Sequence, residues 1–137
     1  MARRAAIQML YQIDLTNQSP CEVMESFWKT FTVSQKVKTF ADYLVQETWK
    51  RKEEIDSVIG KIALNWNLKR MAVVDRNILR LASCEILYID DIPSKVSINE
   101  AIELAKHFSD IESAKFVNGI LDKVSKRKEE SSADLSQ

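Results

Sequence analysis

Two glycines and two prolines in 137 residues restrict the fold of this chain more than any other feature of its sequence. An all-β protein needs a turn after roughly every 8–12 residues, and glycine and proline form most turns. Their scarcity excludes that class. Apolar residues instead recur at the spacing of one helix face, as Phe40, Ala41, Leu44 and Val45 do. The sequence therefore predicts an all-α protein.

About seven helices are predicted from such stripes. Their approximate ranges are residues up to 17, then 19–31, 37–50, 55–62, 71–88, 97–108 and 109–124. Three of them begin with a serine that a glutamate follows three residues later, the pattern of an N-terminal capping box. These pairs are Ser19 with Glu22, Ser97 with Glu100, and Ser109 with Glu112.

The helices are expected to form one domain over residues 1–124, as two small bundles that meet near residue 52. A length of 137 residues suits one domain with a hydrophobic core. Residues 125–137 are polar and charged and offer no apolar face, so we expect them to form a disordered tail.

Several classes of function lack the residues they need. No Gly-rich phosphate loop, nucleophile elbow or HExxH motif occurs, so we expect neither an enzyme nor a cofactor. One histidine and two distant cysteines do not predict a metal site. No apolar run approaches the ~18 residues that span a membrane, so the protein is expected to be cytoplasmic. Twenty basic and twenty acidic residues argue against binding nucleic acid through bulk charge.

Two places are candidates for binding. Arg3 and Arg4 lie on the first turn of a helix, where the helix dipole disfavours cations, so they are either a solvated pair or a site for an anionic partner. In the last helix, Gly119 lies just outside the edge of the apolar face, near Phe116 and Lys115. Lysine and an exposed aromatic suit single-stranded RNA, whereas a bare glycine also suits close packing of a neighbouring helix.

Three stretches resemble the NusB family of transcription antitermination factors. RRAAIQMLYQIDL is similar to the first-helix signature of that family, and WNLKRMAVVDRNILRLASCEIL to its central signature. DIPSKVSINEAIELAKHFSDIESAKFVNGILDKV resembles its C-terminal signature almost throughout. The resemblance spans roughly residues 3 to 124 and implies two small helical subdomains with a non-enzymatic role.

The resemblance also implies partners and sites. Family members bind the ribosomal small-subunit protein NusE, and the pair recognises the single-stranded boxA element of nascent RNA. With other Nus factors and RNA polymerase, they suppress termination, notably in ribosomal RNA transcription. The implied partner-facing residues are Tyr11 and Asp75, which could equally be a core residue and a helix N-terminal acid. The implied RNA-binding residues are Arg3, Arg4, Lys69, Glu112, Lys115 and Phe116.

One departure from the family concerns the basic arm. Many relatives carry several more arginines before the first helix, so we expect this chain to bind RNA weakly without NusE. Two alternatives stay open: a protein-only helical scaffold, and a NusB-like accessory domain of a ribosomal RNA methyltransferase, which would need a cofactor-binding domain after residue 124. In some relatives a homodimer occurs, and the residues leave that state open for this chain.

Overall fold

Seven helices and no strand make up the residues that the computed structural model describes, 1–63 and 70–135, with side chains as far as residue 130. This confirms the predicted all-α class. No described helix has the length and apolar character needed to cross a membrane. The helices are α1 (Ala2–Thr16), α2 (Pro20–Thr30), α3 (Gln35–Lys50), α4 (Lys52–Ile62), α5 (Val73–Tyr88), α6 (Ser94–Phe108) and α7 (Ile111–Leu135).

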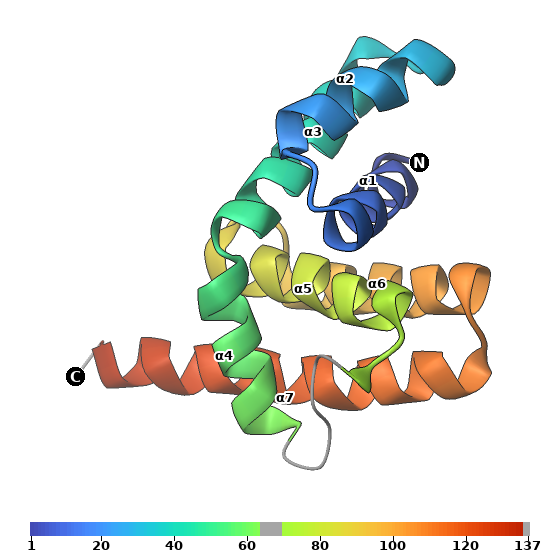
Figure 1. Ribbon diagram of the computed structural model, residues 1–137. Helices are drawn as coiled ribbons and strands as arrows, with labels where there is room; N and C mark the ends of the chain where they lie inside the picture. Colours follow the sequence, from blue (N-terminus) through green and yellow to red (C-terminus); the bar gives the residue numbers. More distant parts are fainter. Residues whose placement is uncertain (64–69, 136–137) are drawn as a thin grey trace.

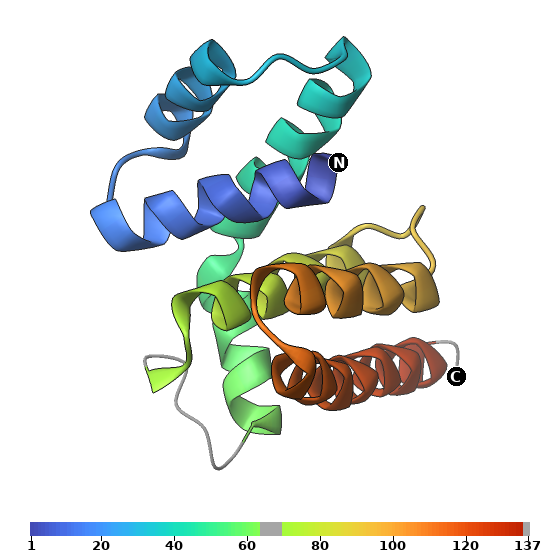
Figure 2. The ribbon, with the colours of Figure 1, turned by 90° about the vertical axis from the view of Figure 1, so that its right-hand side faces the viewer.

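The helices form the two predicted groups. Helices α1, α2 and α3 pack on one another in the upper part of Figure 1, and α5, α6 and α7 stack below them. Figure 2 shows α1 lying across the top of the lower group, where it contacts α5. The change from one group to the other falls at Arg51, where α3 ends and α4 begins, close to the predicted position.

Helix α5 is the centre of the molecule. Every residue from 77 to 86 is buried, although a helix packed on one side buries only a stripe. Four of those ten residues carry a polar side chain. A buried polar group is costly without a hydrogen-bond partner, so α5 needs partners from neighbouring helices. The polar four are Asn77, Arg80, Ser83 and Glu85.

Ion pairs at both ends of α1 supply some of those partners. Arg3 near the start of α1 reaches Glu85, and Asp14 near its end reaches Arg76 and Arg80. Arg80 also makes two hydrogen bonds to Asp56 of α4, at 2.8 and 2.9 Å. The direction of α1 is therefore opposite to that of α5, with its first turn beside the last turns of α5.

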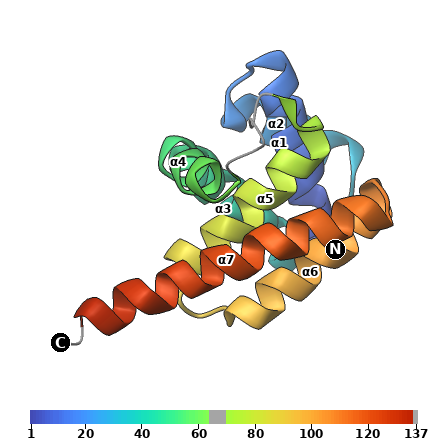
Figure 3. The same ribbon diagram turned by 90° about the horizontal axis from the view of Figure 1, so that it is seen from below.

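The first turns of α5 and α7 lie together. The Ser113 hydroxyl donates to Asp75 Oδ2 at 3.0 Å, and fifteen residues further along the chain from each, Lys128 of α7 contacts Asp90, two residues beyond the end of α5, at 3.1 Å. The two helices are therefore parallel, and Figure 3, the view from below, shows α7 lying in front of α5 and α6. This arrangement brings together residues that lie about 40 positions apart in the sequence.

The predicted helix starts are partly correct. The Ser19 hydroxyl accepts the backbone N–H of Glu22, and Pro20 is the first residue of α2, as expected. The cap predicted at Ser97 is wrong, because α6 begins at Ser94 and the Ser97 hydroxyl instead donates to Glu85. At α7 the capping oxygen comes from Asp110, which accepts the N–H of Ser113, rather than from Ser109.

The last helix is longer than the sequence predicts. We expect a disordered tail from residue 125, whereas α7 continues to Leu135. Residues 125–135 contain no glycine or proline, so nothing in them breaks a helix. Lys126 pairs with Asp122 one turn earlier at 3.1 Å, which supports the helix locally.

Candidate nucleic-acid interface

Arg3, predicted to bind RNA, helps to hold three helices together, α1, α5 and α6. Its Nε and Nη2 atoms donate to the two oxygens of Glu85 at 3.0 and 2.8 Å. Glu85, only 1% exposed, also accepts the Ser97 hydroxyl at 2.9 Å. Burial lowers the pKa of Arg3, but the hydrogen bonds and charge of Glu85 outweigh burial and hold that pKa above its ordinary value. Its charge is thus compensated inside the fold.

Arg4, the next residue, lies on the outer face of α1. Arg4, Gln8, Tyr11 and Leu15 are all exposed and follow one another at intervals of three and four, so they form one stripe along the helix. Tyr11 is 41% exposed, which excludes the alternative that it is a core residue. The cation predicted for RNA and the tyrosine predicted for a protein partner therefore share one face of α1.

Lys115 and Glu112 lie at the start of α7. Both side chains are mostly exposed, and Lys115 Nζ is 3.6 Å from Glu112 Oε1 in an i, i+3 pair. An exposed pair of this kind contributes little to stability, and its partners exchange readily with solvent. Lys115 can therefore turn to an anionic ligand at small cost.

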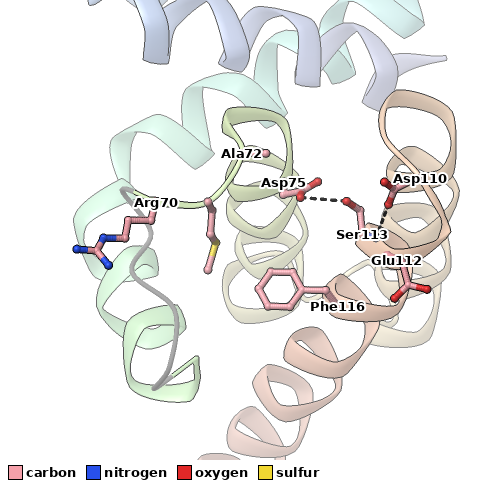
Figure 4. A pocket seen from close by; sticks show the side chains of 8 residues that line it. Arg70, Ala72, Asp75, Asp110, Glu112, Ser113 and Phe116 are labelled. Carbon is pink, nitrogen blue, oxygen red and sulfur yellow. Dashed lines mark hydrogen bonds between the residues drawn. The ribbon is translucent and has the colours of Figure 1, made fainter.

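Phe116 lines a pocket of about 410 Å³ between the first turns of α5 and α7. Figure 4 shows its ring directed toward the start of α5, with Asp75 and Ser113 on the adjoining wall and Arg70 extending outward. Phe116 is partly buried against the core, so its ring is held in place. The pocket is lined by Arg70, Met71, Ala72, Asp75, Asp110, Glu112, Ser113 and Phe116.

Asp75 is the polar group in this pocket whose bonding is incomplete. Its Oδ2 accepts the Ser113 hydroxyl, while its buried Oδ1 has no hydrogen-bond partner within the described part of the chain. Burial raises the pKa of Asp75; the bond from Ser113 opposes that rise, and the negative charge of Asp110 adds to it. The carboxylate can therefore gain from a ligand that brings a hydrogen-bond donor.

The structure groups the predicted residues differently from the expectation. Asp75, expected on the protein-partner surface, shares the pocket of Glu112 and Phe116. Arg3 contacts Glu85, ten residues along α5 from Asp75, which corresponds to about 15 Å. The basic start of α1 and the Phe116 pocket are thus two separate places.

Some pocket residues were missed, and one predicted residue is not described. Lys69 lies outside the described residues. Asp110 and Ser113 are not predicted from the sequence, because the SDIE stretch supplies only Ser109 as an expected helix cap and Glu112 as its cap partner and an expected RNA-binding residue. Ser113 precedes Phe116 by three residues, which places both on one helix face and was an available signal.

Comparison with known proteins decides the family. The family model described as the NusB family matches residues 1–126. The chain belongs to the NusB family. A transcription antitermination protein NusB from Desulfitobacterium hafniense is 47% identical over 126 residues, covering 90% of this chain and 85% of the relative. Another, from Desulforamulus reducens, is 44% identical over 135 residues, covering 98% and 94%.

Solved NusB structures share the fold. A structure of T. maritima NusB is 35% identical with a TM-score of 0.81, covering 91% of this chain and 88% of that one. A crystal structure of the antitermination factors NusB and NusE in complex with double-stranded RNA contains a chain that is 29% identical, with a TM-score of 0.84 and coverage of 92% and 94%. The resemblance seen in the sequence is confirmed, and with it the non-enzymatic character, since NusB proteins are antitermination factors.

Proposed function

We propose that this NusB protein binds boxA-type single-stranded RNA together with NusE, and that the complex joins other Nus factors and RNA polymerase to suppress termination, notably on ribosomal RNA transcripts. Such a complex works where transcripts are made, in the bacterial cytoplasm. One observation carries the proposal: Phe116 lines an open pocket beside the exposed Lys115 in a chain of the NusB family.

The chemistry of this region suits a nucleobase. An aromatic ring offers a stacking face to any base, and stacking contributes about 1–3 kcal/mol per base. Asp75, Asp110 and Glu112 line the same pocket, and carboxylates repel phosphates but accept hydrogen bonds from base amino groups. A base is therefore expected inside the pocket, with the phosphates outside, near Lys115.

The exposed stripe of α1 suits the protein partner. Tyr11 and Leu15 place an aromatic and an aliphatic side chain one turn apart on its outer face, and tyrosine is enriched where proteins bind one another. Arg4 lies two turns earlier on the same stripe. NusE bound at Tyr11 would leave Arg4 near the edge of the interface, available to RNA that both proteins contact.

A binding assay with boxA RNA tests the function. Fluorescence anisotropy is measured for the chain alone and with NusE, and we expect weak binding alone because Glu85 already compensates Arg3. Joint replacement of Lys115 and Phe116 by alanine should weaken RNA binding by the NusE complex about fivefold to 100-fold.

The control and the contrary results are specific. Lys29→Ala removes an exposed lysine of α2, in the other group of helices, and should leave RNA binding unchanged. Unchanged binding after loss of Lys115 and Phe116, with NusE still bound, would favour a protein-only scaffold. Equally tight binding with and without NusE would refute the expected dependence on the partner.

A further inference from the structure

A second hollow lies on α3, away from the Phe116 pocket. It is a shallow groove of about 500 Å³, and the positions of its residues along α3 put them on one helix face. Tyr43 is 43% exposed, although a tyrosine can bury a large apolar area. The groove, called the α3 groove below, is lined by Gln35, Lys36, Thr39, Phe40 and Tyr43.

The charge of the α3 groove differs from that of the Phe116 pocket. No carboxylate occurs among the described residues that line it, and Lys36 supplies an exposed positive charge. Gln35 and Thr39 add polar groups and are hydrogen-bonded to each other at 3.2 Å. Aromatic rings beside a lysine, with no acid to repel phosphate, are the combination that binds single-stranded nucleic acid without sequence preference.

The groove adjoins the basic start of α1. The guanidinium carbon of Arg3 lies 5.6 Å from the centroid of the Phe40 ring, so the first turn of α1 and the groove are in direct contact. Arg4, beside Arg3, is exposed. The groove itself supplies the exposed cation Lys36, and Arg4 is an exposed cation on the adjoining turn of α1.

We propose that the α3 groove is a second binding surface for the same single-stranded RNA, where Tyr43 and Phe40 stack nucleobases while Lys36 and Arg4 contact phosphates. This inference rests on the proposed function and extends it to nucleotides outside the segment that the Phe116 pocket binds. RNA fits better than a protein partner, because five residues of one helix line the groove, whereas a stable protein interface has about 20–30 residues on each side. A stacked base needs only one exposed ring.

RNAs of different length test the proposal in the complex with NusE. One RNA contains boxA alone, and two others extend it by single-stranded nucleotides on the 5′ or the 3′ side. At least one extended RNA should bind more tightly than boxA alone. Tyr43→Ala should weaken that extended RNA about fivefold to 100-fold, the effect of losing one stacked base, and leave boxA alone unchanged.

Matched variants separate stacking from other effects. Tyr43→Phe keeps the ring and should retain the affinity of the extended RNA, while Lys36→Ala should weaken it and make it less dependent on salt. Lys50→Ala removes an exposed lysine at the far end of α3, about 21 Å away, and should change nothing. Circular dichroism melting of each variant checks that the fold is intact.

The outcomes distinguish the two proposals. If Tyr43→Ala leaves every RNA unaffected while loss of Lys115 and Phe116 weakens them all, the proposed function stands and the α3 groove is not an RNA surface. If Tyr43→Ala weakens NusE binding or self-association instead, the groove binds protein and the inference is overturned. If the wild-type complex binds none of the RNAs, both proposals fail.

Discussion

Two carboxylates near the start of α5 have opposite surroundings. Asp14 of α1 accepts hydrogen bonds from Arg76, Asn77 and Arg80, at 2.7, 3.0 and 2.9 Å. Asp75, the residue before Arg76, accepts one from Ser113 and has an oxygen with no partner among the described residues. Adjacent positions of one helix turn thus hold a closed ion network on one side and an open pocket on the other.

The difference separates a carboxylate that stabilises the fold from one whose hydrogen bonding a ligand could complete. Burial raises the pKa of Asp14, but the bonds from Arg76 and Asn77 and the arginine charges outweigh it and lower that pKa overall. For Asp75 burial prevails and the pKa is raised. A carboxylate with complete bonding stabilises the folded chain, whereas one with incomplete bonding costs stability unless a partner completes it.

The largest expected difference is in stability. Asp14→Ala should lower the free energy of unfolding by about 3 kcal/mol, because Asp56 is then the one carboxylate left to the buried Arg80 among the described residues. Asp75→Ala should change it by less than about 1 kcal/mol, since the lost carboxylate has one hydrogen bond and Ser113 keeps its contact with Ser109. Urea unfolding measures both, and equal losses would contradict the distinction.

The pH dependence should have opposite signs at the two sites. Folding lowers the pKa of Asp14, so its contribution is present above the ordinary value near 3.8 and is lost as pH falls through the folded value. Folding raises the pKa of Asp75. Its contribution to stability is therefore present below the ordinary pKa and is lost as pH rises through the pKa of the folded chain.

Asparagine variants make this sign measurable, because asparagine does not titrate and removes the pH dependence of the aspartate that it replaces. The stability that Asp14→Asn loses relative to wild type should be larger at about pH 7 than at about pH 3. The free energy of unfolding of Asp75→Asn, taken relative to wild type, should be higher at about pH 7 than at about pH 3. Urea unfolding at the two pH values checks both, and a parallel trend in the two variants would refute the assignment.

The sequence predicts the helices well because apolar periodicity is a local signal. It also contained a signal for Arg3 that was overlooked. Arg3 precedes Ala6, Ile7 and Leu10 by three, four and seven residues, so it lies on the buried face, whereas Arg4 falls on the exposed one. That spacing could have distinguished the anchoring arginine from the exposed one.

The Phe116 pocket could not be predicted in this way. Asp75 and Ser113 are 38 residues apart in sequence, and no periodicity places one helix start beside another. The parallel packing of α5 and α7 brings them together, and that depends on the whole core. For the same reason Asp75 was assigned to a surface separate from that of Phe116.

The two glycines give the smallest and most selective comparison, because one lies near the ion network and the other near the Phe116 pocket. Gly60 follows Asp56 of the ion network by one turn of α4, and Gly119 follows Lys115 by one turn of α7. A Cβ added at either position would meet no described atom within 4 Å. Close packing against another described helix therefore does not explain Gly119. Of the two interpretations made from the sequence, clearance for RNA is the one that is left.

Alanine at each glycine tests that clearance. Both Gly60→Ala and Gly119→Ala should stabilise the protein by about 1 kcal/mol, because glycine is the poorer helix former and neither site is crowded. If RNA lies on Phe116 and Lys115 as proposed, it passes over Gly119, so only Gly119→Ala should weaken RNA binding by the NusE complex. Thermal unfolding and anisotropy measure the two effects. Equal RNA affinity in both variants would show that the RNA does not approach this turn of α7, and the bound base would then have to enter the pocket from the side of α5.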